Sequence, residues 1–157
     1  MPTEALPVTI GREPFDSPDA ATLRAAQRAE LDARYGNDSH EPGPVPTADS
    51  VPVFLVARDD AGSAVGCGGL RPLDGGGAEV KRMYVAPHAR GRGVSTAILR
   101  AIEDEARAMG LARLVLETGS AQPDAMRFYE REGYTRIANF GHYADSELSL
   151  CYARDLG

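Results

Sequence analysis

The feature that most constrains this chain is the stretch from Met83 to Leu99, where an apolar run meets Pro87 and then the basic segment Arg90-Gly91-Arg92-Gly93. It predicts a strand, a turn at the proline, a tight loop and a helix beginning near Gly93. Glycine permits sharp bends and close approach of a ligand. Successive N–H groups at a helix start bind anions, and the arginines add positive charge. The sequence therefore predicts a phosphate-binding loop.

Two common phosphate loops do not fit this segment. A P-loop has the pattern G-x-x-x-x-G-K-[ST], and here no lysine follows Gly93. The dinucleotide fingerprint G-x-G-x-x-G ends on a third small residue, where this chain has Thr96. The pattern that remains is Arg-x-x-Gly-x-Ser over residues 90–95.

A second informative segment runs from Gln122 to Tyr134 and reads QPDAMRFYEREGY. It predicts a short helix, with Pro123 near its start, that ends at Gly133. The first segment resembles the pyrophosphate loop [QR]-x-x-G-x-[GA] of the GNAT superfamily of acyl-CoA-dependent N-acetyltransferases, with Ser95 at the last position. The second resembles that family's A-x-x-F/L-Y-x-x-x-G-F/Y segment. The resemblance runs from about residue 53 to residue 150.

The resemblance implies an enzyme that transfers an acetyl group from acetyl-CoA directly to a primary amine of a small molecule or peptide, without a metal. Backbone groups of Met83 and Val85 would pair with the pantetheine amides. Amides of residues 91–96 would hold the pyrophosphate. The implied cofactor-binding residues are Met83, Tyr84, Val85, Arg90, Gly91, Arg92, Gly93, Val94, Ser95, Thr96 and Gln122.

The catalytic residues that we expect are Tyr129 and Glu79. A phenol is protonated at neutral pH, so Tyr129 suits the protonation of a departing thiolate. The alternative role of Tyr129 is that of an aromatic side chain packed in the core from an amphipathic helix. Glu79 lies in a strand expected to be central, where a charge is costly without partners. It could accept the proton of the amine, or it could form a structural ion pair with Lys81 or Arg82.

The acceptor pocket is expected at the first helix and the loop at 139–147. Tyr35 and Glu30 on that helix and His142 in that loop are the candidate substrate-binding residues, although His142 could equally be a solvated loop histidine. Small amines, amino acids, antibiotics and protein N-termini all remain open as acceptors. Two other functions are also open: a non-catalytic acyl-CoA sensor, and a regulatory domain that binds ordinary nucleotides, which the missing lysine and Mg²⁺-binding carboxylates disfavour.

The order of elements predicts one α+β domain over residues 1–157, with a mixed, mostly antiparallel, twisted sheet of about six to seven strands flanked by helices. A strand–helix–strand unit after the loop predicts a parallel crossover. The expected strands are Pro7–Ile10, Val51–Arg58, Ala64–Leu70, Ala78–Val85, Arg113–Thr118, Tyr134–Ala138 and Leu148–Ala153. The expected helices follow Ser17-Pro18 up to Gly36, Gly93 up to Gly110, and Pro123 to Glu132, with a mobile loop at 37–50.

Composition limits the classes of partner that the protein is expected to bind. The net charge of −6 over 157 residues disfavours nucleic acid. No apolar run approaches the ~20 residues of a membrane span, and the first residues lack a signal-peptide pattern. We therefore expect a cytoplasmic protein with no membrane partner. Cys67 and Cys151 are expected to be buried free thiols. A homodimer is compatible with the sequence.

Overall fold

The computed structural model describes residues 4–37 and 45–157. Its strands form one seven-stranded sheet in the order β1-β2-β3-β4-β5-β7-β6. The strands are β1 (Thr9–Arg12), β2 (Val53–Arg58), β3 (Ala64–Pro72), β4 (Gly77–Val85), β5 (Arg113–Gly119), β6 (Thr135–Ile137) and β7 (Ser149–Asp155). The α-helices are α1 (Pro18–Tyr35), α2 (Val94–Ala108) and α3 (Pro123–Arg131), and the 3-10 turns are η1 (Pro87–Ala89) and η2 (Gly141–Tyr143).

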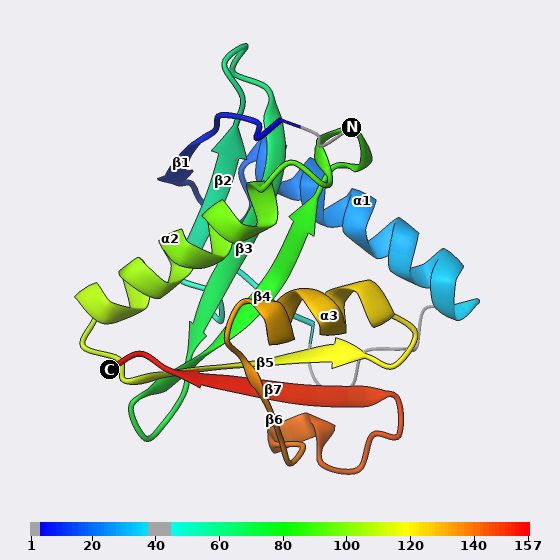
Figure 1. Cartoon of the computed structure of the whole chain (residues 1–157), viewed down its shortest axis with the longest axis vertical. Helices are drawn as coiled ribbons and strands as arrows, with labels where there is room; N and C mark the ends of the chain where they lie inside the picture. Colours follow the sequence, from blue (N-terminus) through cyan, green and yellow to red (C-terminus); the bar gives the residue numbers. More distant parts are fainter. Residues whose placement is uncertain (1–3, 38–44) are drawn as a thin grey trace.

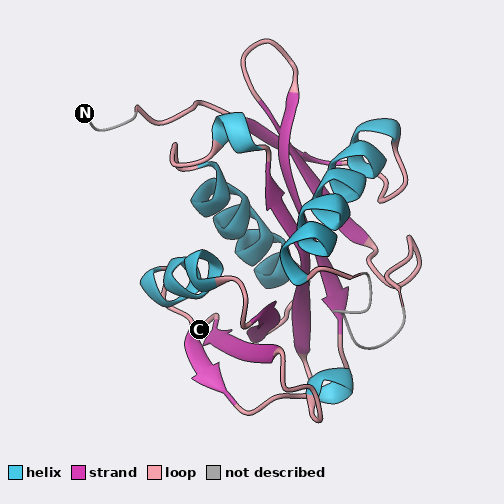
Figure 2. Ribbon diagram, turned by 90° about the vertical axis from the view of Figure 1, so that its right-hand side faces the viewer, coloured by secondary structure: helices cyan, strands magenta, loops and turns pink. Residues whose placement is uncertain are grey.

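The helices lie on both faces of this sheet. Helices α2 and α3 cover the face toward the viewer in Figure 1, and α1 lies behind the strands. Figure 2 shows the same arrangement from the side. The predicted α+β fold with a mixed, mostly antiparallel sheet is confirmed.

The sheet opens between its central strand, β4, and the neighbouring strand β5. Strands β2, β3 and β4 form an antiparallel meander. Strands β4 and β5 are the parallel pair, and their pairing covers Gly77–Glu79 opposite Arg113–Val115. Strand β4 then continues to Val85 and β5 to Gly119 without further pairing between them in the described chain. The remaining length of the two strands borders a gap that other groups must fill.

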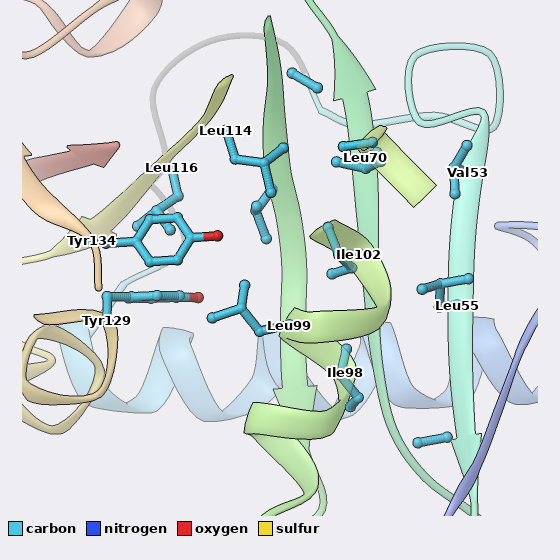
Figure 3. Close-up of a cluster of buried hydrophobic side chains, with 14 of the residues drawn as sticks. Val53, Leu55, Leu70, Ile98, Leu99, Ile102, Leu114, Leu116, Tyr129 and Tyr134 are labelled. Atoms are coloured by element: carbon cyan, nitrogen blue, oxygen red, sulfur yellow. The ribbon is translucent and has the colours of Figure 1, made fainter. Parts of the chain in front are cut away.

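Glycines in β3 allow α2 to lie close to the sheet. A Cβ on Gly68 would lie 2.8 Å from Ile102 Cδ1 and 3.1 Å from Ile98 Cγ2. Both isoleucines are fully buried in the main core, together with Leu99. Figure 3 shows this helix packed across the strands, with Tyr129 beside the same core. The glycines that weaken β3 as an isolated strand are therefore needed for packing.

A buried ionic network fixes the far end of α2. Glu103 is 1% exposed, and its carboxylate accepts hydrogen bonds from Arg100 at 2.8 Å, Arg154 at 2.8 Å and the Tyr134 hydroxyl at 2.9 Å. Burial raises the pKa of Glu103, but these hydrogen bonds outweigh that effect and hold the pKa below its usual value. The network joins α2 to β7 and to the segment between α3 and β6.

Local sequence signals predicted most ends of helices and strands to within one or two residues of those in the structure. The Ser17 hydroxyl accepts a hydrogen bond from Ala20 N at 3.3 Å, and Gly36 ends α1 at φ 76°. The first strand is Thr9–Arg12 rather than Pro7–Ile10, because its position is set by pairing with β2. Met109 follows the last residue of α2 and is 41% exposed.

Two further expectations can be compared with the structure. Cys67 and Cys151 are buried free thiols, as predicted. Part of the loop expected at 37–50, residues 38–44, lies outside the described residues. Within residues 4–37 and 45–157, no helix is long and apolar enough to cross a membrane.

Candidate active site

Three adjoining cavities follow the gap between β4 and β5. The strand cavity, of about 120 Å³, lies between Lys81–Met83 and Glu117–Gly119 and reaches Tyr129. The middle cavity, of about 350 Å³, extends along Met83–Val85 and the start of α3. The loop cavity, of about 290 Å³, lies at the glycine loop and the start of α2. The middle cavity shares lining residues with both others, so the three form one track from the sheet interior to the loop.

The glycine loop has the geometry that its sequence predicts. Gly91 and Gly93 have φ values of 74° and 82°, and no atom lies within 4 Å of where a Cβ would stand on either. The first backbone hydrogen bond of α2 runs from Ala97 N to Gly93 O at 3.1 Å. The amides of residues 94–96 therefore have no acceptor within the helix, as at any helix start. This end of α2 faces the loop cavity and suits an anion.

The open edge of β4 presents backbone groups to the middle cavity. Val85 lies opposite Gly66, next to the hydrogen bond from Ala86 N to Val65 O. Because backbone groups alternate between the two edges of a strand, those of Val85 face away from β3. Met83 O accepts a hydrogen bond from Gln27 Nε2 at 2.8 Å. This edge can receive an extended amide-bearing chain as an added strand.

The remaining predicted cofactor residues divide into two groups. Ser95, Gln122 and Tyr84 line the middle cavity, and Val94 and Thr96 line the loop cavity. Arg92 lines none of the three cavities, and its Nε donates to Glu4 O at 3.1 Å. The structure therefore brings all the predicted cofactor residues to the track except Arg92.

Tyr129 lies where the strand cavity and the middle cavity meet. Its ring is 8% exposed and packs edge-on against Phe128 and Tyr134, with centroids 5.1 Å and 5.9 Å away. Figure 3 shows the two tyrosine rings side by side, next to Leu116 and Leu99. Burial and the charge of Glu117 raise the pKa of Tyr129, so its hydroxyl is protonated at neutral pH.

Glu79 is 1% exposed and lies in a polar cluster with Arg71, Lys81 and Tyr143. Its Oε2 accepts a hydrogen bond from the Tyr143 hydroxyl at 2.6 Å and lies 3.6 Å from Lys81 Nζ. Its Oε1 lies 3.2 Å from Arg71 Nη2. The ion pair with Lys81 that the sequence offered as an alternative is thus present. Glu79 lines none of the three cavities, whereas Lys81 lines the strand cavity and donates to Tyr143 at 3.0 Å.

The predicted substrate residues have different surroundings. Tyr35 lines the strand cavity and lies against Gly119, where a Cβ would lie 1.4 Å from the Tyr35 hydroxyl oxygen. Glu30 lines the middle cavity and pairs with Arg90 at 2.8 Å, a hydrogen bond that lowers the pKa of Glu30. His142 is exposed and lines none of the cavities. The structure thus brings Tyr35 to the strand cavity, Glu30 to the loop arginine, and His142 to neither.

Sequence reasoning missed several residues of the strand cavity. Glu117 from β5 and Gln27 from α1 line it, and Tyr143 rather than its neighbour His142 joins the Glu79 cluster. Gln27 carried no local signal. Glu117 sits in the run Leu116–Gly119, which is prominent in the sequence but indicates no role by itself. Within the described residues, no group of three or more His, Cys, Asp or Glu side chains could hold a metal ion.

Comparison with known proteins identifies relatives that are named acetyltransferases. The sequence model of the acetyltransferase (GNAT) family matches residues 21–134. An IAA acetyltransferase of Azospirillum brasilense is 45% identical over 104 residues, which are 66% of this chain and 67% of that protein. An uncharacterized N-acetyltransferase of Schizosaccharomyces pombe is 33% identical over 91 residues, 57% of this chain and 56% of that protein.

Solved structures share the whole architecture. A candidate acyl-CoA N-acyltransferase from Klebsiella pneumoniae has a TM-score of 0.82 at 30% identity, covering 96% of this chain and 98% of its own. A GNAT acetyltransferase from Elizabethkingia anophelis, solved with acetyl-CoA bound, has a TM-score of 0.69 at 18% identity and covers 94% of this chain and 97% of its own. The second likeness shows the fold alone.

The parted strands, the glycine loop and the cavity track define an acyl-CoA-dependent transferase fold. The chain belongs to the acetyltransferase (GNAT) family. The predicted family and the predicted class of enzyme, an N-acetyltransferase, are confirmed. The alternative of a non-catalytic sensor finds no support in these comparisons.

Proposed function

We propose that this chain binds acetyl-CoA along the cavity track and transfers the acetyl group directly to a primary amine held in the strand cavity. The observation that carries the proposal is the position of Tyr129, where the cavity reached from the glycine loop meets the cavity between β4 and β5. Two reactants that enter from these two sides would meet at Tyr129. Such a placement turns a bimolecular encounter into a reaction within one site.

The residues along the track fit the parts of acetyl-CoA. The amides at the start of α2 and the open space at Gly91 and Gly93 suit the pyrophosphate. The edge of β4 at Val85 that faces away from β3 suits the pantetheine amides, and Val85 O there also accepts a hydrogen bond from Arg90 Nε at 2.9 Å. When bound, acetyl-CoA supplies an activated thioester.

Tyr129 is the proposed general acid. In the transfer, a bond forms between the amine nitrogen and the acetyl carbon while the carbon–sulfur bond breaks. The electron pair of the broken bond leaves on sulfur, which takes the proton of the Tyr129 hydroxyl. The raised pKa of this phenol keeps the proton in place until the negative charge develops on sulfur.

Glu79 is the proposed general base, and it acts through its neighbours. The amine has to lose a proton, and Glu79 does not line the cavity. The hydrogen bonds from Lys81 to Tyr143 and from Tyr143 to Glu79 connect its carboxylate with the cavity wall. Along this connection Tyr143 would give its hydroxyl proton to Glu79, Lys81 would give one proton to Tyr143, and Lys81 would then take the proton of the amine. In the resting site the charge of Glu79 stabilises the buried Lys81 ammonium.

The experiment that tests the proposal measures acetyl-CoA binding by calorimetry and free-thiol release over a panel of amines. Gly93→Val places a side chain in the anion site and is expected to weaken acetyl-CoA binding at least tenfold. Gly75→Val is the matched control, because Gly75 has a similar φ of 88° and open space but lies outside the track. Arg92→Ala is expected to change the affinity less than Gly93→Val.

The outcomes of this experiment test the pyrophosphate site and the transfer reaction separately. Weak binding by Gly93→Val with normal binding by Gly75→Val supports the loop as the pyrophosphate site. Parent-like affinity of a folded Gly93→Val protein contradicts it. Binding of acetyl-CoA with no acceptor-dependent thiol release over the whole panel contradicts the transfer reaction.

A further inference from the structure

Helix α1 contacts both strands that border the gap. Gln27 Nε2, near the middle of the helix, donates a hydrogen bond to Met83 O of β4 at 2.8 Å. At the end of the helix, the hydroxyl of Tyr35 lies against Gly119, the last residue of β5. Residues four apart share one face of a helix, and Gln27, Leu31 and Tyr35 all line the strand cavity. One face of α1 therefore forms a wall of this cavity.

Gly119 is required for packing and not for backbone conformation. It is not among the described glycines with positive φ. A Cβ at this position would lie 1.4 Å from the Tyr35 hydroxyl oxygen and 2.6 Å from Cζ of the same ring. Glycine in a strand can mark a site where another group approaches closely. Here that group is the side chain of Tyr35, and any larger residue at 119 would have to displace it.

The far end of the Tyr35 side chain is enclosed by two further parts of the chain. Gln122 Nε2, just before α3, lies 3.5 Å from the hydroxyl oxygen, and the backbone of Gly119 lies on the β5 side. Both residues line the strand cavity together with Tyr35. A tyrosine side chain has only two torsion angles, and contact at its far end restricts both. Tyr35 is therefore a stiff part of the cavity wall.

The strand cavity is the smallest of the three cavities in the track. Its volume is about 120 Å³, compared with about 350 Å³ for the middle cavity and about 290 Å³ for the loop cavity. Pockets for drug-sized ligands have about 300–1,000 Å³. Because Tyr129 and Tyr35 line the same cavity, a group held beside Tyr129 has little room before it meets the Tyr35 ring.

We propose that Tyr35, held in place by its contact with Gly119, sets the upper size limit of the acceptor amine. The inference rests on the proposed acetyl transfer and narrows its substrate class to small primary amines. An amine that needs the volume of the ring has to displace a stiff wall or bind out of reach of Tyr129. One methylene in a fitted pocket changes kcat/KM by about 10–200-fold, so an added phenyl group should be rejected at least tenfold.

The test compares acceptors of graded size. Free-thiol release is measured over the panel of amines, and mass spectrometry verifies N-acetylation of the products. Each acetylated amine is then compared with homologues that are longer by two and four methylene groups and with an analogue that carries a phenyl group. The readout is the size ratio, which is kcat/KM for the phenyl-bearing amine divided by kcat/KM for the small amine. We expect a size ratio below one tenth for the parent.

Substitutions of Tyr35 assign this limit to its ring. Tyr35→Ala removes the ring at the last residue of α1 and keeps a good helix former there, so the size ratio should rise at least tenfold. Tyr35→Phe removes the hydroxyl and keeps the ring, so its size ratio should stay within threefold of the parent value. Acetyl-CoA affinity in calorimetry should be unchanged in both variants, because the loop and β4 hold the cofactor.

A double-mutant cycle tests the contact with Gly119. Gly119→Ala pushes the Tyr35 ring out of position and should lower kcat/KM for the small amine at least tenfold. The same substitution made in Tyr35→Ala meets no ring and should cost less than threefold. Gly11→Ala in β1 is the matched control, because nothing lies within 4 Å of a Cβ there and the residue lines none of the three cavities. Should Gly119→Ala not fold, recovery of folding in the double variant supports the contact, and continued failure contradicts it.

Three results overturn the inference and leave the proposed transfer reaction intact. The first is equal use of small and phenyl-bearing amines by the parent. The second is a size ratio that Tyr35→Ala does not raise, or that Tyr35→Phe raises equally. The third is an equal cost of Gly119→Ala with and without the Tyr35 ring. Absence of thiol release with every amine, although acetyl-CoA binds in calorimetry, defeats the proposed function itself.

Discussion

Tyr129→Phe is the change that bears most directly on the chemistry. It removes one oxygen and keeps a ring that packs against Phe128 and Tyr134. Because the acetyl-CoA contacts lie in the loop and on β4, the affinity for acetyl-CoA should stay within about threefold of the parent. The melting temperature should change little, since the ring contacts persist.

Turnover should respond much more strongly than binding. A positioned acid contributes about 10²–10⁴-fold to the rate, which corresponds to about 3–5 kcal/mol of transition-state stabilisation. We expect kcat of Tyr129→Phe to fall by that factor, measured by free-thiol release on a confirmed acceptor. The loss should appear in kcat and in kcat/KM alike, because the interaction is made in the transition state.

The pH dependence gives a second readout. The raised pKa of Tyr129 keeps this acid protonated up to a pH above the ordinary phenol value of about 10. Any decline in parent kcat caused by its ionisation should therefore lie above that pH and should be missing in Tyr129→Phe.

Tyr134→Phe is the matched control for this variant. It removes a hydroxyl next to the same ring, and that hydroxyl donates to Glu103 outside the cavities. Its cost should be about 1–3 kcal/mol of stability with turnover close to the parent. A folded Tyr129→Phe enzyme with parent turnover would refute the assignment, and water would then be the source of the proton for sulfur.

Three further changes test the surrounding structure. Glu79→Gln should lower kcat by about 10²–10⁴-fold with acetyl-CoA affinity unchanged, and an unchanged kcat would leave Glu79 with a structural ion pair alone. Glu103→Gln should cost about 3 kcal/mol in urea unfolding at pH 7. The pKa of Glu103 is lower in the folded than in the unfolded protein, so the contribution of Glu103 to the free energy of unfolding is complete above the unfolded pKa of about 4.3 and is lost as the pH falls through the folded pKa. The stabilities of parent and variant should therefore converge in acid. A stability difference that stays constant with pH would contradict this argument. Gly68→Ala should destabilise the fold by about 1–3 kcal/mol through contact with Ile102, and a melting temperature equal to the parent's would show that α2 can shift freely.

The sequence by itself determined the features that depend on a few neighbouring residues. Positive φ at Gly91 and Gly93, the Ser17 cap and the Gly36 stop follow from the conformational limits of those residue types. The order of strands and helices predicted the parallel crossover and the mostly antiparallel sheet. The loop and Tyr129 were predicted as site residues because two short segments resemble motifs of the GNAT family.

Only the tertiary structure decided which side chains meet across the sheet. The sequence offered His142 for the site, but the fold exposes it and places Tyr143 on Glu79 instead. It gave no role to Glu117, because the parting of β4 and β5 that opens the cavity depends on pairing between distant segments. Side-chain contacts between residues far apart in the chain are set by strand register and helix packing, and no local pattern encodes them.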